Sequence, residues 1–413
     1  MALSSLQERL QELAAISDGP GLTRAFLSPA LRRCHEAIAS WLEPDRFHLR
    51  FDALGNLFIR LRRDAVDPRP RLLMGSHLDT VRDAGAYDGP LGFLLALHVL
   101  ETQGEALSAT GGAVPEVVGF SDEEGLRFQT AYLGSSYVAG SFSRSWLDLN
   151  DAEGQSLADA LRQWGSDPAA LALESPQPPL AAYLEAHIEQ GPVLEQRKVP
   201  CGVVTAIAAQ TRIALSLQGQ AGHAGTVPMD LRRDALGGAA EWLTSVEQAP
   251  QKFPDLRVTV GQLNVSPGAS NVIPGRIDAT LDARHPVGAE LEHALSWLEE
   301  RFLEVARQRQ LRPQWTFRQS QPAVACDARL REAFATVLES RQSSVPLLPS
   351  GAGHDAVAIS LACPVGMLFV RCRDGLSHCP EEFVEPADLE AAADAFSAGV
   401  LEAARALSAK AIS

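Results

Sequence analysis

Residues 72–92, LLMGSHLDTVRDAGAYDGPLG, give the clearest indication of the fold. Residues 72–74 are apolar and predict a buried strand, which ends at His77 and Asp79. Alternate residues of a strand point to the same face, so these two side chains lie together, as a metal-binding histidine and its orienting carboxylate would. A glycine-rich turn then brings Asp88 back towards His77. The segment therefore indicates a buried strand with a polar site at its carboxyl end.

The composition is that of a folded protein without membrane-spanning segments. The chain has 413 residues, 46% of them hydrophobic, which is enough for two domains or for one domain inserted into another. No apolar run approaches the roughly 20 residues that a membrane helix needs, and the N-terminus lacks the features of a signal peptide. The net charge of −15 argues against nucleic acids and anionic membranes as partners. The six cysteines form no C-x-x-C pair, which indicates reduced thiols, and we expect a cytoplasmic protein.

The pattern of apolar residues changes twice along the chain. In the first half, short apolar runs alternate with helical patterns, which is typical of an α/β domain. From about Arg212 the chain shows a strand, a helix at 229–247, two strands, a helix at 287–309 and a strand, the β-α-β-β-α-β order of a ferredoxin-like domain. The first pattern then returns. We therefore predict a three-layer α/β domain formed by 1–210 and 326–413, with an α+β domain inserted at 211–325.

Histidines and acids recur after other predicted strands, each time beside glycine. The motifs are SDEEG at 121–125, EAHIEQGP at 185–192 and GLSHCPEE at 375–382. On its own, an H-x-D at a strand end is more often a surface pair, and DEEG is usually a solvated turn. Their recurrence favours one shared site in the crevice where open α/β sheets bind ligands. Since no cysteine pair is suited to metal binding, a metal there would use histidine and carboxylate ligands.

The whole set of motifs resembles one enzyme family. GLTRAFLSP at 21–29, GSHLDTV, GAYDGPLG, DEEG, HIEQGP, GHAGTVPM, GAGHDA and SHCPEEF at 377–383 follow in order over nearly the whole chain. They resemble the dinuclear metal-dependent amidohydrolases of the M20 peptidase family, within the branch of allantoate amidohydrolases, N-carbamoyl-L-amino-acid hydrolases and β-ureidopropionases. The resemblance implies that the α/β domain is catalytic and that the inserted domain pairs in a homodimer. The alternative is a monomer whose inserted domain serves only as a lid.

The resemblance also implies two divalent metal ions in each subunit. Five residues match the ligands: His77, Asp88 and His187 for one ion, and Asp88, Glu124 and His378 for the second. Glu123 matches the family's catalytic acid/base, and Asp79 matches the residue that orients His77. Mixed nitrogen and oxygen ligands suit zinc, manganese or cobalt, and the sequence does not choose among them.

A further set of residues matches positions that contact the substrate: Gln190, His223, Asn271, Arg284 and His354. His223 would take part in catalysis by donating to the developing oxyanion, often in the partner subunit's site. Arg284, with Asn271, would bind a substrate carboxylate through its two-pronged guanidinium group. The alternatives are a surface loop for His223 and a salt bridge with Asp282 for Arg284. The histidines without a partner motif are assigned to the surface or to helix faces: His35, His48, His285 and His293.

The function implied by the resemblance is hydrolysis of a ureido group of allantoate, giving ureidoglycine, ammonia and carbon dioxide in purine catabolism. The negative charges of Asp88, Glu124 and a hydroxide would offset all but about one of the positive charges of two divalent ions. The remaining positive charge favours an anionic ureido substrate. N-carbamoyl-L-amino acids or β-ureidopropionate are the alternative substrates, and the ureido-type site disfavours a dipeptidase or aminoacylase. A binding protein that has lost the chemistry is a remote alternative, because every ligand position and Glu123 are present.

Overall fold

The computed structural model describes residues 3–171 and 179–409. Contacts within the chain divide it into two compact units. The first comprises Met1–Thr205, Cys326–Leu348 and His354–Ser413, and the second comprises Ala206–Ala325 and Pro349–Gly353. Within the described ranges, no helix combines the length and the apolar character that crossing a membrane requires.

A mixed sheet forms the centre of the first unit. Its strands lie in the order β1-β2-β4-β3-β5-β15-β6. Their bounds are β1 Phe47–Phe51, β2 Leu57–Leu61, β3 Arg71–His77, β4 Val114–Phe120, β5 Leu180–Ile188, β6 Cys201–Ile207 and β15 Val365–Val370, and β14 (Leu347–Ser350) also pairs with β6. The neighbours β4, β3, β5 and β15 are parallel, and β1, β2 and β6 pair antiparallel. Every residue of β3, β4 and β15 is buried, as expected for parallel strands covered on both faces.

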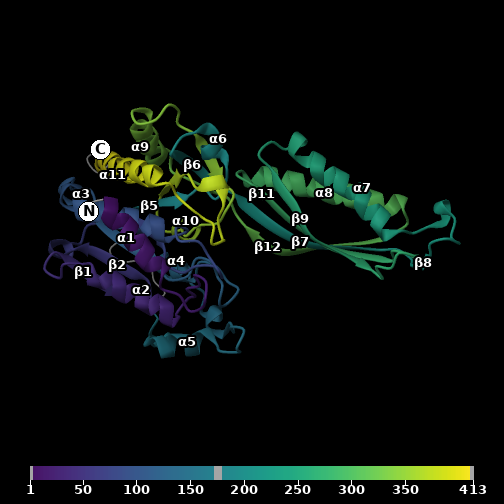
Figure 1. Ribbon diagram of the computed structural model, residues 1–413, viewed down its shortest axis with the longest axis horizontal. Coiled ribbons are helices and arrows are strands. Elements are labelled where there is room, and N and C mark those ends of the chain that lie inside the picture. Colours follow the sequence, from purple (N-terminus) through teal and green to yellow (C-terminus); the bar gives the residue numbers. More distant parts are fainter. Residues whose placement is uncertain (1–2, 172–178, 410–413) are drawn as a thin grey trace. The chain divides into compact units, whose positions relative to one another are not determined.

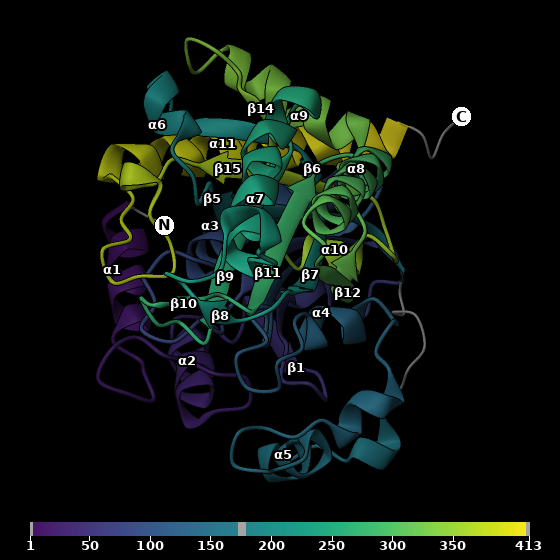
Figure 2. The same cartoon turned by 90° about the vertical axis from the view of Figure 1, so that its right-hand side faces the viewer.

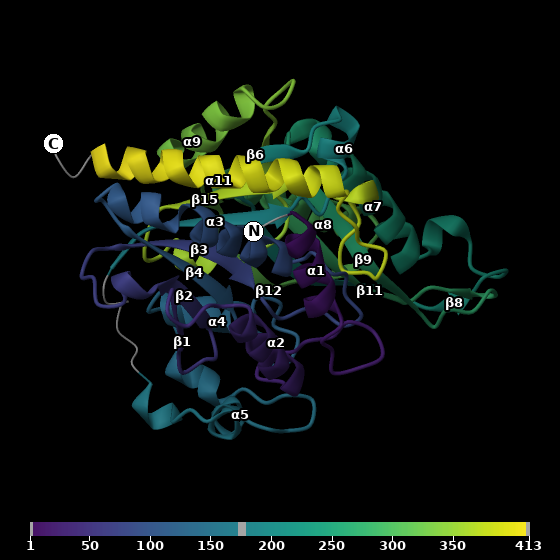
Figure 3. The same ribbon diagram turned by 60° about the vertical axis from the view of Figure 1, so that its left-hand side comes forward.

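Helices cover both faces of this sheet. On one face α1 (Leu3–Ala14), α3 (Pro90–Ala109), α9 (Ala328–Glu339) and α11 (Pro386–Ala409) share one apolar core with the strands. Figure 3 shows α11, in yellow, alongside α3, and Figure 1 shows how these early and late segments meet within the first unit. On the other face α4 (Leu133–Val138) packs against α10 (Ala356–Ile359). The remaining helices are α2 Pro29–Ser40, α5 Leu157–Trp164, α6 Val193–Arg197, η1 Arg62–Asp64, η2 Arg144–Asp148, η3 Pro168–Ala170 and η5 Arg373–Gly375.

The second unit is an antiparallel sheet with two helices on one face. The strands β7 (Ala209–Gln218), β9 (Arg257–Ser266), β11 (Arg276–His285) and β12 (Arg312–Gln321) lie in the order β12-β7-β11-β9. Figure 2 shows α7 (Ala235–Lys252) beside α8 (Gly288–Gln308), and their apolar faces close one core with the strands. The smaller elements are β8 Gly222–His223, which pairs with β10 Val272–Ile273, η4 Met229–Leu231, and β13 Val324–Ala325, which pairs with the end of β6. The chain order is β-α-β-β-α-β.

The predicted α/β fold class is confirmed, whereas one helix begins later than predicted. The apolar spacing predicted a helix at 229–247, but α7 begins at Ala235 because the Asp234 carboxylate accepts the N–H groups of Leu236 and Gly237. The second unit begins at Ala206, close to the domain boundary predicted at residue 211. It also includes residues 349–353. In that added segment the N–H of Ala208 donates to the Ser350 carbonyl oxygen at 2.9 Å.

Two histidines that the sequence analysis assigned to the surface or to helix faces are buried. The side chain of His35 on α2 packs against the rings of Phe51 and Trp164. The Nε2 atom of His285 donates to the carbonyl oxygen of Pro254 at 2.7 Å, and its Nδ1 atom accepts the N–H of Val287 at 3.0 Å. The assignment of His285 was wrong, because it ends the strand β11 and its ring is buried, whereas His35 lies on a helix, as that assignment allowed, with its ring in the core. All six cysteines are free thiols.

Candidate metal centre

The carboxyl ends of the parallel strands carry the predicted ligands. His77 is the last residue of β3, His187 lies one residue before the end of β5, and Glu124 follows the end of β4. Asp88 lies in the turn between β3 and α3, and His378 lies in the loop after β15. The carboxyl ends of parallel strands meet at one edge of a sheet, so residues far apart in sequence converge there.

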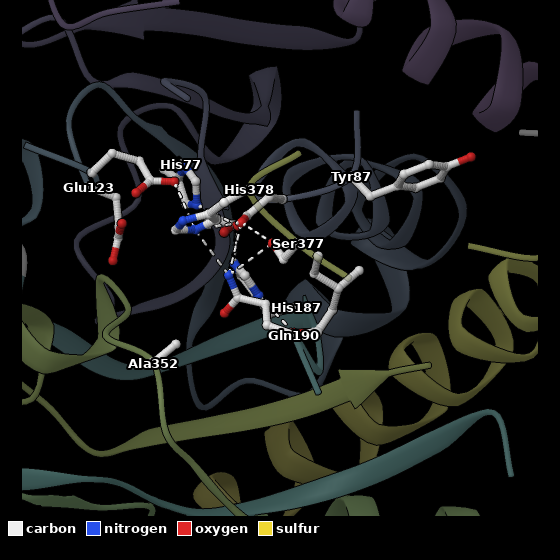
Figure 4. Close-up of polar contacts among 12 residues, drawn as sticks. His77, Tyr87, Glu123, His187, Gln190, Ala352, Ser377 and His378 are labelled. Atoms are coloured by element: carbon white, nitrogen blue, oxygen red, sulfur yellow. Dashed lines mark hydrogen bonds and ion pairs between the residues drawn. The ribbon is translucent and has the colours of Figure 1, made fainter. Parts of the chain in front are cut away.

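The Asp88 carboxylate contacts three histidines, and its two oxygens face different partners. Figure 4 shows these histidines, His77, His187 and His378, close together. The Oδ1 atom of Asp88 is 3.1 Å from Nε2 of His187 and 3.5 Å from Nε2 of His77. Its Oδ2 atom is 3.1 Å from Nε2 of His378, which in turn lies 3.6 Å from Oε1 of Glu124. Within each of two groups the possible ligand atoms all lie within 4.8 Å of one another: His77, Asp88 and His187, and Asp88, Glu124 and His378. These groups are the two predicted ligand sets, and they share Asp88.

Hydrogen bonds to the main chain orient the two buried histidines. Nδ1 of His77 lies 2.9 Å from the carbonyl oxygen of Asp79, and Nδ1 of His187 lies 3.0 Å from that of Ile188. In a neutral ring Nδ1 is then the protonated nitrogen and Nε2 carries the free lone pair. Both Nε2 atoms face Asp88. A fixed ring with a free Nε2 lone pair is what a metal-binding histidine presents.

Asp79, predicted to orient His77, also holds the acid pair that follows β4. Its carboxylate accepts the N–H of Glu123 at 2.9 Å and the N–H of Glu124 at 3.2 Å. The same carboxylate is 3.6 Å from Nδ1 of His77, so the closer bond of that ring is to the Asp79 carbonyl oxygen. Asp79 therefore joins the ends of two neighbouring strands.

The acids of the site differ in their affinity for protons. Burial raises the pKa of Glu123 well above its usual value, and the charge of Glu124 raises it further. Burial and the charge of Asp88 raise the pKa of Glu124 to about 7. Burial alone would raise the pKa of Asp88, but hydrogen bonds from three histidines hold it well below its usual range. Both glutamates therefore hold a proton more tightly than an exposed carboxylate does, and Glu123, which lies outside the two predicted ligand sets, has its carboxyl group available for proton transfer.

The donor set fits divalent cations. Among the described residues, the ion pairs recorded for Asp79, Asp88 and Glu124 are with histidines and not with lysine or arginine. Carboxylates buried without a compensating cation cost several kcal/mol each. Three protein ligands for each ion, with a position left open, is the pattern of a catalytic metal site. The residues present therefore match what two divalent ions need.

Gln190, predicted to lie near the ureido group, contacts the Asp88 carboxylate. Its Nε2 atom donates to Oδ2 of Asp88 at 2.9 Å and to Oγ of Ser377 at 3.2 Å, and it lies 3.3 Å from Nε2 of His378. The Oε1 atom of Gln190 is buried and has no hydrogen-bond partner among the described residues. The amide nitrogen therefore lies between two members of the second ligand group.

His354 is buried beside the first ligand group. Its ring centroid lies 4.5 Å from that of His187, edge to face. Burial and the charge of His187 lower the pKa of His354 well below its usual value, which keeps the ring neutral. Glu185, His187 and His354 form another possible ligand group, but it uses the same Nε2 atom of His187. It is therefore an alternative to the first group and not an independent third site.

The other predicted substrate residues belong to the second unit. The exposed His223 lies on β8, opposite Val272 of β10, and the N–H of Ala224 donates to the carbonyl oxygen of Asn271 at 2.9 Å. Nδ1 of His223 accepts the N–H of Gly225 at 3.0 Å. In a neutral ring the proton is then on Nε2, which can donate to an oxyanion. The ribbon β8–β10 thus brings His223 and Asn271 together.

Arg284 is paired with Asp282, the alternative that the sequence raised. Nε and Nη2 donate to the two oxygens of Asp282 at 2.8 and 3.1 Å, and Nη1 donates to the carbonyl oxygen of Gly351 at 2.7 Å. An arginine has five N–H donors, so one proton remains on each terminal nitrogen. Arg284 can therefore hold Asp282 and still offer two parallel donors to a carboxylate.

Three polar residues around the site were not predicted from the sequence. Glu185 is buried and accepts a hydrogen bond from Oγ of Ser76 at 2.7 Å. It lies two residues before His187 on β5, and that spacing alone places both on one face. Ser377 and Glu382 bind the Asp88 loop, and their only signal was a position inside the GLSHCPEE motif.

Comparisons with known proteins agree on one family. The profile of peptidase family M20/M25/M40 matches residues 73–402. The chain is 40% identical to the probable allantoate deiminase of Oryza sativa subsp. japonica, over 93% of this chain and 85% of that protein. It is 37% identical to the N-carbamoyl-L-amino acid amidohydrolase of Geobacillus stearothermophilus, over 94% of this chain and 95% of that protein. The crystal structure of an amidase of the hydantoinase/carbamoylase family from Burkholderia multivorans matches with a TM-score of 0.88 and 31% identity, over 98% of each chain.

Proposed function

Because this chain belongs to peptidase family M20/M25/M40, we propose that it binds two divalent ions and hydrolyses a ureido C–N bond of allantoate. The family is metal-dependent, and the chain is a hydrolase of linear C–N bonds. The products are ureidoglycine, ammonia and carbon dioxide. The observation that carries the proposal is the Asp88 carboxylate, whose Oδ1 atom faces His77 and His187 while its Oδ2 atom faces His378.

Glu123 carries the proton transfers. Two divalent ions, zinc, manganese or cobalt, supply Lewis-acid activation of the ureido carbonyl and of a water molecule when bound. Glu123 removes a proton from that water as its oxygen bonds to the ureido carbon. It then returns the proton to the nitrogen that leaves as the C–N bond breaks. Asp79 fixes the backbone of Glu123 for both steps.

Residues of the second unit recognise the anionic substrate. The Nε2–H group of His223 donates to the oxyanion that develops on the ureido carbonyl. Arg284 offers its two remaining protons to the substrate carboxylate, and Asn271, which precedes β10, supports this contact. In the first unit, Gln190 and His354 lie beside the ligand groups and face the ureido end.

We further propose that the protein works as a homodimer in which His223 serves the site of the partner subunit. Mixing His223→Ala with Glu123→Gln protein tests this, because subunit exchange then creates one site with both residues intact. Activity that returns on mixing supports the shared site. If the mixture stays as inactive as its two components, the second unit acts within its own chain.

The substrate is tested by ammonia release. Protein stripped of metal is reloaded with manganese, zinc or cobalt and is given allantoate, N-carbamoyl-β-alanine or N-carbamoyl-L-amino acids. We expect kcat/KM for allantoate to exceed the others by about a hundredfold, or ~2.7 kcal/mol of transition-state discrimination. A preference for an N-carbamoyl amino acid would move the chain to the second candidate function, which its 37% identity to the Geobacillus stearothermophilus enzyme favours. Full metal occupancy without turnover of any ureido or amide substrate would indicate a binding protein.

A further inference from the structure

Glu382 is a buried acid that joins the two loops carrying Asp88 and His378. Only 4% of its surface is exposed. Its Oε1 atom accepts the N–H of Tyr87 at 2.7 Å and the N–H of Asp88 at 3.0 Å. Its Oε2 atom lies 2.9 Å from Oγ of Ser377, whose single hydroxyl proton is shared with a second carboxylate acceptor. Glu382 and Asp88 are 294 positions apart in sequence, so a single carboxylate fixes two distant segments.

Ser377 extends this contact to the Asp88 side chain. Its hydroxyl lies 2.7 Å from Oδ2 of Asp88 as well as 2.9 Å from Oε2 of Glu382, and Figure 4 shows it next to His378 and Gln190. Asp88 is thereby held at its backbone nitrogen by Glu382 and at Oδ2 by Ser377. The ring of Tyr87 points away from the cluster in Figure 4, so Tyr87 contributes only its main chain.

Glu382 is itself held in place. Its N–H donates to the carbonyl oxygen of Cys379 at 3.1 Å, which closes the turn after His378. On the other side the backbone of Gly85 packs against it, since a Cβ atom added to Gly85 would lie 2.3 Å from Cβ of Glu382. A flexible surface acid would have neither contact. The carboxylate thus has one position from which it reaches both loops.

We propose that Glu382 is a positioning residue that fixes the Asp88 carboxylate so that Oδ1 serves one metal-ligand group and Oδ2 serves the other. Glu382 belongs to neither group and acts through Asp88 and Ser377. Without it the Asp88 side chain can turn about its Cα–Cβ bond and satisfy one group at the expense of the other. Hydrogen-bond partners of metal ligands typically change metal affinity by about ten- to a hundredfold when removed. The proposal rests on the proposed metal centre.

The test is calorimetric titration of the metal-free full-length protein with Mn²⁺. We expect Glu382→Ala to weaken Mn²⁺ binding by about tenfold or more. Glu382→Gln should stay within about threefold of wild type, because its amide oxygen still accepts both N–H groups and its amide nitrogen can donate to Ser377. The matched control is Glu381→Ala, which removes the same charge from the exposed neighbouring residue. In the positioning role, kcat of Glu382→Ala recovers towards wild type as Mn²⁺ is raised to saturation, which a general packing defect would not allow.

Each outcome of this titration bears on one claim. Wild-type protein that binds none of Mn²⁺, Zn²⁺ and Co²⁺ contradicts the proposed function itself. If the wild type and Glu382→Ala bind two ions equally tightly, only the role of Glu382 is overturned. The same holds if Glu382→Gln loses as much affinity as Glu382→Ala. If Glu382→Ala lacks the wild-type circular dichroism spectrum, Ser377→Ala takes its place. We expect Ser377→Ala to bind Mn²⁺ about three- to tenfold more weakly, and wild-type affinity would overturn the proposal.

Discussion

The two units hold their functional residues in opposite ways. In the first unit, His77, Asp88 and His187 are almost fully buried and contact one another. In the second unit, His223 and Asn271 are exposed, and Arg284 is bonded to Asp282 within its own strand. The first set is organised before any ligand arrives, whereas the second set consists of donors with unused capacity.

This difference indicates which kinetic parameters the residues of each unit should affect. Groups held rigidly around a metal centre act on the transition state and should affect kcat. In the second unit, Arg284 gains its partner only with the substrate carboxylate, so it contributes binding and should affect mainly KM, whereas His223, which donates to the developing oxyanion, should affect kcat. This division of roles would be contradicted if a variant of the first unit changed only KM, or if a variant of the second unit changed the metal content.

The strongest test of the organised site is Asp88→Asn. An amide cannot give each ligand group a carboxylate oxygen, so we expect the loss of both ions and a fall of about 10⁴-fold or more in kcat/KM. Asp83→Asn makes the same chemical change at an exposed position of the same turn and should bind metal and turn over normally. Metal content by mass spectrometry and initial rates measure both effects. Retention of two ions by Asp88→Asn would contradict its bridging role.

Glu123→Gln separates chemistry from metal binding within the first unit. Because Glu123 transfers protons and belongs to neither of the two predicted ligand sets, we expect kcat to fall by about 10³-fold with the metal content intact. The amide still fills the buried space and keeps the backbone N–H that binds Asp79. Single-turnover rates and metal analysis on the same sample measure the result. Retained turnover, or loss of both ions, would remove the proton-transfer role from Glu123.

Arg284→Ala tests the second unit. A charged hydrogen bond to the substrate carboxylate contributes about 1.5–3 kcal/mol, so we expect KM to rise by about ten- to a hundredfold while kcat changes little. Asp282→Asn leaves the arginine but removes the charge that orients it, and it should raise KM by a smaller factor. Steady-state kinetics with the metal-saturated protein distinguish the two. A large fall in kcat with KM unchanged would place Arg284 among the groups that act on the transition state.

That the candidate site residues of the first unit lie close together could be predicted from the sequence, because their positions follow a simple rule. His77 ends β3, His187 lies next to the end of β5, and the Glu123–Glu124 pair follows β4, and parallel strands bring such ends together. The order of strands and helices in the second unit was equally readable from its apolar periods. In both cases the signal lies in consecutive residues, which a pattern can detect.

The contacts that connect distant segments left no such signal. The hydrogen bond that the N–H of Asp88 donates to Glu382 spans 294 positions, and no sequence pattern near either residue predicts it. Gln190 was expected near the substrate, but its donation to Asp88 depends on how three loops meet. The beginning of α7 at Ala235 was missed for a local reason, since Asp234 caps the helix through its side chain.

The smallest predicted effect concerns the pH dependence of stability, and it distinguishes His35 from the buried histidines of the metal centre. Burial, with the charges of Arg24 and Arg32, lowers the pKa of His35 to about 3, whereas acids outweigh the burial of His77 and raise its pKa. The lowered folded-state pKa of His35 means that the unfolded chain binds the extra proton between about pH 6.5 and pH 3. Its contribution to stability is therefore complete above about pH 6.5 and falls by ~1.4 kcal/mol per pH unit below it.

We expect His35→Phe to make the free energy of unfolding less sensitive to acid between pH 6.5 and 5.5, with kcat at neutral pH unchanged. Urea unfolding at the two pH values measures this, and His293→Gln, at an exposed position on α8, is the control. A variant as acid-sensitive as wild type would mean that His35 is already charged in the folded protein.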